Sequence, residues 1–198
     1  MAVLIASTLR WVNCGLKRLR GALVFAGLLL ANGPVLPAET SPAPEYQLKA
    51  AFLFNFAQFV EWPAQAFPEA QTPLIIGVLG ENPFGTYLDD LVRGETVKNR
   101  PLVVQRFRRV DEIKTCHVLF IGRPDADRPG QALTSLKGRS ILTVGDTDSF
   151  AQRGGMIRFA SEKNKIRMKI NLEAAKAAGL TISSKLLRSA DIVAPGKD

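Results

Sequence analysis

The side chains that most often carry out catalysis or bind metal are scarce in this sequence. His117 is the only histidine, and the two cysteines are Cys14 and Cys116. A catalytic histidine works with a nucleophile and an orienting carboxylate, and common zinc sites use several cysteine or histidine ligands. No such set can be assembled here. We therefore interpret His117 as a buried, hydrogen-bonded residue at the start of a strand.

Glycines and aspartates provide two further patterns that could bind a ligand. Gly77, Gly80 and Gly85 (GVLGENPFG) do not have the spacing of a dinucleotide or phosphate loop, so we interpret them as a strand-to-helix turn. Asp146 and Asp148 (GDTDSF) follow an expected strand, where α/β folds often place ligands. They could hold a metal ion, but turn and helix-capping roles explain them more simply. No serine lies in a GxSxG turn, so the sequence predicts no enzyme, cofactor or metal site.

Short apolar runs alternate with helical patterns, as they do in an α/β fold. Continuous apolar runs predict strands at residues 74–79, 102–107, 118–121 and 140–144. Apolar residues at three- and four-residue steps predict a helix over 45–60, and further helices are expected from Pro83 and over 131–136. Strands joined through helices form right-handed crossovers. We therefore predict a single three-layer α/β sandwich domain with a mostly parallel sheet.

The carboxyl-terminal part has a different pattern. Residues 156–159 and 166–170 alternate apolar with basic or polar side chains, and the turn at 161–164 between them predicts an antiparallel hairpin. A helix over 172–178, an extended piece at 181–183 and a last helix through Ile192 follow. Asn171, Ser183 and Ser184 are expected to cap these helices rather than to recognise a partner.

The first 38 residues have the order of segments found in a secretory signal peptide. A basic stretch without acidic residues is followed by an apolar run at 21–31 and by the small residue Ala38. The apolar run is about half of the roughly 20 residues that a membrane span needs. We predict a signal peptide over 1–38, cleavage near Ala38, and an exported domain over 39–198.

Charge and cysteine content both change once this leader is removed. The leader holds four basic residues (Arg10, Lys17, Arg18 and Arg20) and no acidic ones, so its loss lowers the net charge from +8 to +4. Such a mild excess does not predict binding to nucleic acid, which needs clustered basic residues. Cys14 also lies in the leader. Cys116 is then the one cysteine of the exported domain, which excludes an internal disulfide, and its apolar neighbourhood favours a buried, inert thiol.

Two groups of side chains are candidates for contact with a protein partner. The helix over 45–60 and the residues after it carry more aromatic side chains than one helix face can hold, among them Phe54, Phe59 and Trp62. The hairpin carries Arg158 and Arg167 on the side opposite its apolar residues. Core packing and a solvated strand face are the simpler interpretations. A partner-binding surface made of these five residues is the alternative hypothesis.

Four segments, in order, resemble one known family. They are KAAFLFNFAQFVEWP (49–63), CHVLFI (116–121), LTVGDTDSFAQRGGMIRF (142–159) and INLEAAKAAGLTISSKLLRSA (170–190). Together they are similar to the YfiR-like family of small periplasmic proteins, over nearly the whole exported domain. YfiR itself carries cysteine pairs linked to its redox response, whereas this chain keeps only Cys116.

The resemblance implies a regulator rather than an enzyme. Proteins similar to YfiR bind the periplasmic sensor domain of an inner-membrane diguanylate cyclase, and this binding represses cyclic di-GMP synthesis and biofilm formation. An outer-membrane-associated lipoprotein can sequester the repressor, and the family's α/β sandwich commonly forms a homodimer. A second hypothesis is a small-ligand-binding module that feeds a membrane receptor. Its crevice would lie at the carboxyl ends of the strands, near Gly80 and Asp146.

Overall fold

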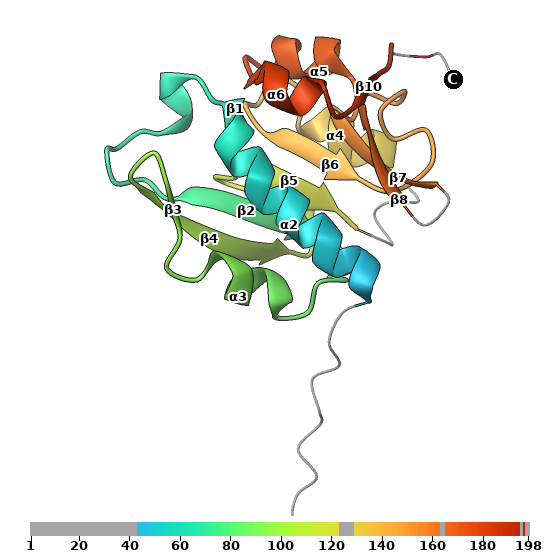
Figure 1. Cartoon of the computed structure of the whole chain (residues 1–198). Helices are drawn as coiled ribbons and strands as arrows, with labels where there is room; N and C mark the ends of the chain where they lie inside the picture. Colours follow the sequence, from blue (N-terminus) through green and yellow to red (C-terminus); the bar gives the residue numbers. More distant parts are fainter. Residues whose placement is uncertain (1–42, 123–128, 163–164, 195, 197–198) are drawn as a thin grey trace, which may run out of the picture. The chain divides into compact units, whose positions relative to one another are not determined.

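A sheet of eight strands runs through the domain, with helices packed on both of its faces (Figure 1). The computed structural model describes residues 43–122, 129–162, 165–194 and 196. The sheet has the order β10-β8-β7-β6-β5-β2-β4-β3. Its strands are β2 (Leu74–Leu79), β3 (Thr96–Val97), β4 (Arg100–Phe107), β5 (Val118–Ile121), β6 (Leu142–Gly145), β7 (Ile157–Glu162), β8 (Lys165–Ile170) and β10 (Asp191–Ile192).

The sheet is mostly parallel, as the sequence predicts. The run from β4 through β2, β5 and β6 to β7 is parallel, while β7 and β8 form the predicted antiparallel hairpin. All residues of β2, β5 and β6 are buried, which explains why these strands appear in the sequence as continuous apolar runs. Two shorter strands, β1 (Val60–Glu61) and β9 (Thr181–Ile182), pair antiparallel with each other in a separate small sheet.

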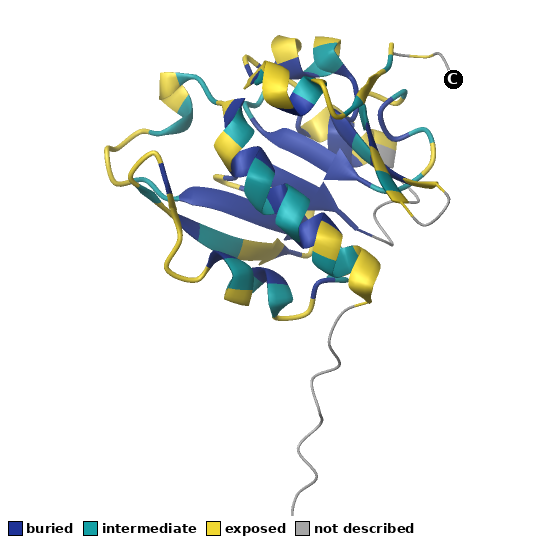
Figure 2. Ribbon diagram, viewed as in Figure 1, coloured by how far each residue is buried: buried dark blue, intermediate teal, exposed yellow. Residues whose placement is uncertain are grey.

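Two separate hydrophobic clusters show that the sandwich has three layers. On one face, α2 (Pro44–Phe59) and α3 (Tyr87–Val92) cover the sheet, with Phe56 and Leu53 among the fully buried side chains. On the other face, α4 (Pro129–Ser135) packs Ala132 and Leu133 against strand residues such as Leu119. We call these the α2 face and the α4 face. In Figure 2 the central strands are buried, whereas the outer side of α2 is largely of intermediate exposure.

The order in which successive strands are added to the sheet reverses between the parallel neighbours β2 and β5. The connection from β2 to β4 passes through α3 on the α2 face, whereas the connection from β5 to β6 passes through α4 on the α4 face. The carboxyl ends of these two neighbouring strands therefore lead away to opposite faces. Such a point is where open α/β sheets usually hold ligands.

Caps and turns explain how several elements end. The Asn171 side chain accepts a hydrogen bond from the Ala174 amide at 3.0 Å at the start of α5 (Leu172–Ala177). Ser183 Oγ accepts one from the Lys185 amide at 3.2 Å at the start of α6 (Ser184–Leu187). Both caps confirm the prediction from sequence.

Two details of the prediction are wrong. The last helix ends at Leu187 rather than near Ile192, because residues 191–192 pair with β8 as the short strand β10. Gly80 and Gly85 do have positive φ angles, as turn residues should, but Gly77 lies inside β2. A Cβ atom at Gly77 would come within 2.7 Å of Cys116 Sγ, so close packing explains this glycine.

Among the described residues, no helix is both long and apolar enough to cross a membrane. The predicted signal peptide over 1–38 and its cleavage near Ala38 fall outside the described residues.

Candidate functional site

The predicted contact residues Phe54 and Phe59 lie on opposite flanks of α2. Leu53 and Phe56 mark the side of the helix that faces the sheet, and both are fully buried. Five residues correspond to about 140° around a helix axis, which separates Phe54 from Phe59. Both rings are half-buried and pack against the edge of the same core cluster. The Phe59 ring also lies 4.9 Å from the Lys185 ammonium.

Trp62 belongs to a cluster at the amino end of β5. Its indole N–H donates a hydrogen bond to the His117 carbonyl at 3.1 Å, and its ring meets the His117 ring edge-on. Phe67 stacks on the other side of His117 at 4.4 Å between ring centres, and the Arg100 guanidinium covers Phe67. Trp62 is therefore half-buried and held at a fixed orientation.

His117 is fully hydrogen-bonded inside this cluster. The Ile75 amide donates to Nδ1 at 3.0 Å, and Nε2 lies 3.1 Å from the Ala66 carbonyl oxygen. Because Nδ1 accepts, the ring is neutral and Nε2 carries the proton. Burial lowers the pKa of His117, and the charge of Arg100 lowers it further. This confirms the interpretation of His117 as a buried, hydrogen-bonded residue.

The basic residues of the hairpin lie on the α4 face. Phe159 and Met168 pair across the hairpin on the α2 face, so the neighbouring pairs Arg158 with Lys169 and Ala160 with Arg167 point the other way. Arg158 is largely buried and forms an ion pair with the exposed Asp148. Arg167 is exposed.

The structure therefore does not bring the five predicted contact residues into one surface. Phe54, Phe59 and Trp62 pack against the core on the α2 face, whereas Arg158 and Arg167 lie on the α4 face. We call the first group the aromatic surface and the second the basic hairpin. A partner that contacts both must reach around an edge of the sheet.

A buried ion cluster near the carboxyl end of β6 was missed by the sequence analysis. Lys49 on α2 is only 2% exposed, and its Nζ lies 2.6 Å from Asp146 and 2.7 Å from Glu45. The Tyr46 hydroxyl donates to the same Asp146 oxygen at 3.0 Å. Glu45 also accepts from Ser161, and the hydrogen bond from Lys49 is the main reason why the pKa of Glu45 is lowered. The cluster ties α2 to β6 and to the hairpin.

Only part of this cluster could be read from the sequence. Glu45 and Lys49 have the i, i+4 spacing of a helical ion pair, but Asp146 lies 97 positions further along the chain. Its carboxylate was expected in a turn or in a ligand site. The structure gives it a buried lysine as a partner instead, which is a structural role.

Two cavities lie near the carboxyl ends of the strands. A small one of about 250 Å³ lies at the point where the sheet reverses, and Tyr46, Glu81 and Asp146 are among its lining residues. A larger one of about 1220 Å³ lies beside α4 and the short helix η2 (Val110–Glu112).

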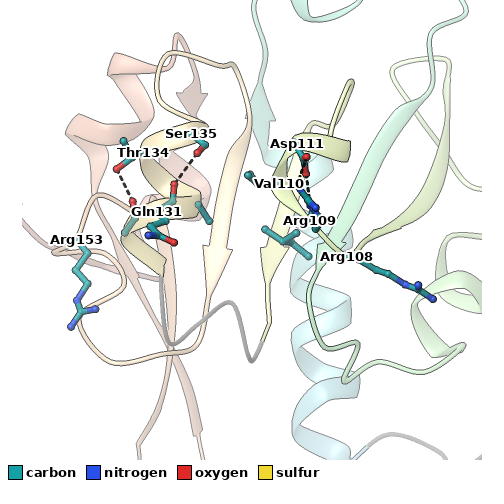
Figure 3. A pocket seen from close by; sticks show the side chains of 11 residues that line it. Arg108, Arg109, Val110, Asp111, Gln131, Thr134, Ser135 and Arg153 are labelled. Atoms are coloured by element: carbon teal, nitrogen blue, oxygen red, sulfur yellow. Dashed lines mark hydrogen bonds and ion pairs between the residues drawn. The ribbon is translucent and has the colours of Figure 1, made fainter.

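The polar groups around the larger cavity do not converge on a ligand position. Figure 3 shows Arg108 and Arg153 extending outward at its two sides, while Arg109 pairs with Asp111. The Thr134 hydroxyl bonds to a carbonyl of its own helix. Among the described residues, no group of three or more potential metal ligands is present.

Comparison with known proteins identifies the family. A model of the YfiR/HmsC-like family matches residues 46–191, which includes every strand of the sheet except the last residue of β10. The chain belongs to the YfiR/HmsC-like family. A search of curated proteins gave no significant match.

Among solved structures, one similar chain is an ABC domain from Streptococcus pneumonia in complex with L-Trp. It is 11% identical, with a TM-score of 0.45 over 66% of this chain. The match covers only 58% of that protein.

This member of the YfiR/HmsC-like family holds its one described cysteine in the core. Cys116 is 5% exposed and packs beside Gly77. Burial raises its pKa to about 12. The structure confirms that Cys116 is buried, and a thiol with such a pKa stays protonated at neutral pH.

Proposed function

We propose that this protein is a periplasmic regulator that binds the periplasmic sensor domain of an inner-membrane diguanylate cyclase. Binding represses the cyclase, and this lowers cyclic di-GMP signalling and biofilm formation. The observation that carries the proposal is the family match over residues 46–191. The fold agrees with it, because the α/β sandwich is the architecture that the resemblance implies.

Repression requires that the protein binds one state of the sensor better than the other. A repressor shifts the cyclase only by the difference between its affinities for the inactive and the active state. A ratio of about 100 between these affinities corresponds to roughly 2.7 kcal/mol of bias toward the inactive state. No chemical step is needed, and the protein acts stoichiometrically.

The aromatic surface and the basic hairpin are the proposed contact regions. Half-buried aromatic rings and arginines are the residue types that most often dominate binding energy at protein interfaces. Phe54, Phe59 and Trp62 have this character on one face of the sheet, and Arg158 and Arg167 have it on the other. An outer-membrane-associated lipoprotein and a second copy of this chain are further partners implied by the resemblance.

Affinity capture tests the proposal. The protein, tagged at its carboxyl end, is expressed with its leader and recovered from envelope extracts, and bound proteins are identified by mass spectrometry. We expect a membrane protein with a cytoplasmic cyclase domain. Overexpression should then lower cellular cyclic di-GMP only in cells that contain this cyclase.

Matched variants separate specific contact from general charge. Phe59→Ala and Arg167→Glu should each weaken capture about tenfold or more. Arg188→Glu makes the same charge change at an exposed position outside the hairpin and should leave capture unchanged. Export and folding without recovery of any membrane sensor would refute the repressor function.

A small-ligand-binding module that feeds a membrane receptor is the second candidate. The small cavity lined by Tyr46, Glu81 and Asp146 favours it, because it lies where open α/β sheets bind ligands. Thermal unfolding of the purified protein against a library of periplasmic solutes tests this function. A saturable rise in melting temperature that Glu81→Gln abolishes would support it, and no rise with any solute would count against it.

A further inference from the structure

The outer edge of β8 is only partly covered. On its inner side β8 pairs with β7 along its whole length, from Lys165 opposite Glu162 to Ile170 opposite Ile157. On its outer side β10 pairs only with Lys169 and Ile170. The rest of this edge has no strand beside it within the described residues.

The direction of each backbone group along β8 follows from two hydrogen bonds. The Asn171 amide donates to the Met156 carbonyl, so position 171 bonds toward the β7 side. The Val193 amide donates to the Ile170 carbonyl, so position 170 bonds toward β10. In an antiparallel pair these directions alternate. Ile166 and Met168 therefore direct their N–H and C=O groups outward.

Three of these four outward groups are available to a new strand. In the parallel pairing of Asp191 with Lys169, the Asp191 amide donates to the Met168 carbonyl. Within the described residues, no strand lies beside the two Ile166 groups or the Met168 N–H group. The Met168 side chain is buried and the Ile166 side chain is half-buried, so packing against the core holds β8 in place. Added strands bind to sheet edges of this kind through main-chain hydrogen bonds.

The side chains next to this edge are cationic. Lys165, Arg167 and Lys169 alternate with the outward-bonding residues and lie together on the α4 face. None of the three takes part in an ion pair within the described part of the chain, whereas Arg158 nearby is paired with Asp148. Asp191 of β10 lies opposite Lys169, so Lys165 and Arg167 are the two cations beside the uncovered part of the edge. Glu162, opposite Lys165, is the one acidic residue of the described hairpin strands.

We propose that the outer edge of β8 receives an extended, acidic segment of a protein partner as an added strand. Main-chain hydrogen bonds to both Ile166 groups and to the Met168 N–H group would hold the segment, and its carboxylates would face Lys165 and Arg167. A second copy of β8 does not fit, because its own cations would lie beside these two. The proposal goes beyond the proposed function, since it does not depend on the partner being a cyclase.

Charged residues also occur at sheet edges simply to prevent aggregation. Binding of a short probe distinguishes this role from recognition. The probe is a heptapeptide of alternating glutamate and valine, and the control is the same peptide with lysine in place of glutamate. Both are titrated into the purified protein, and amide hydrogen exchange is followed by NMR.

Strand addition has a specific signature in this measurement. The amides of Ile166 and Met168 should exchange at least tenfold more slowly with the glutamate peptide. The amide of Arg167 should not change, because it already bonds to β7. The lysine peptide should have no effect. Unchanged exchange at both Ile166 and Met168 under saturating glutamate peptide would overturn the proposal.

Two variants test the two parts of the contact separately. Ile166→Pro removes an outward N–H without breaking the β7 ladder and should weaken the peptide about fivefold, while Ile166→Val should bind normally. Arg167→Glu combined with Lys165→Glu should transfer the preference to the lysine peptide. This charge reversal does not depend on how well the proline variant folds. Retention of the glutamate preference after reversal would also overturn the proposal.

Discussion

Acidification should destabilise the protein through one residue, His117. The folded state holds the ring neutral, because Nδ1 accepts from the Ile75 amide and Nε2 donates to the Ala66 carbonyl. A second proton on Nδ1 would face the Ile75 N–H group, and the nearby Arg100 also opposes it. The pKa of His117 is therefore lower in the folded protein than its ordinary value of about 6.5 in the unfolded chain.

The sign and size of the effect follow from proton linkage. Below about pH 6.5 the unfolded chain binds a proton that the folded protein resists, so the free energy of unfolding falls as pH falls. One proton gives a slope of at most about 1.4 kcal/mol per pH unit. Between pH 6.5 and pH 5 the loss is thus up to about 2 kcal/mol. Glu45, whose pKa is lowered, loses its contribution only at more acidic pH, below about 4.3.

Urea unfolding at pH 7.5, 6.5 and 5 measures this loss. Trp62 reports on the site directly, since its indole N–H is bonded to the His117 carbonyl. His117→Asn keeps an acceptor for the Ile75 amide but cannot titrate, so its stability should be nearly flat across the same range. An equal loss in the wild type and the Asn variant, or no loss in the wild type, would refute the reasoning.

Three further predictions concern buried contacts. Asp146→Asn leaves the buried Lys49 with fewer countercharges and should lower the unfolding free energy by about 3 kcal/mol, whereas Asp90→Asn, whose partner Arg93 is exposed, should change it by less than about 0.5 kcal/mol in the same urea assay. Gly77→Ala should destabilise by about 1–3 kcal/mol because its Cβ would meet Cys116, and Cys116→Ala should recover part of this loss in the double variant. The Cys116 thiol should react with Ellman's reagent only when urea unfolds the protein, at neutral pH.

The strands and the hairpin could be predicted from sequence because their side-chain patterns are local. The run at 74–79 is apolar throughout since β2 is buried on both faces, and the alternation at 166–170 reflects one covered and one solvated face. Strand β10 could not be predicted, because two residues are too few to show the alternation of apolar and polar side chains that marks a strand. Asp191 and Ile192 form a strand only since β8 offers them an edge.

The arrangement of the contact residues could not be predicted for a different reason. Alternation along β8 shows that Arg167 points away from Met168, but it does not show which face α2 covers. In a sandwich with helices on both faces, either side of a strand can lie over a core. The pairing of Asp146 with Lys49 is equally nonlocal, since it depends on where α2 crosses the carboxyl end of β6.

The separation of the aromatic surface from the basic hairpin makes two modes of regulation distinguishable. If one partner contacts both, it must wrap around the β8 edge. Changes at Phe59 and Arg167 would then weaken the same complex, and the effects on binding free energy would add because the sites are far apart.

If each surface binds its own partner, Phe59→Ala would weaken one complex and Arg167→Glu the other. A second partner could then bind without displacing the first. Release of the first partner would in that case require a change of conformation that both surfaces share.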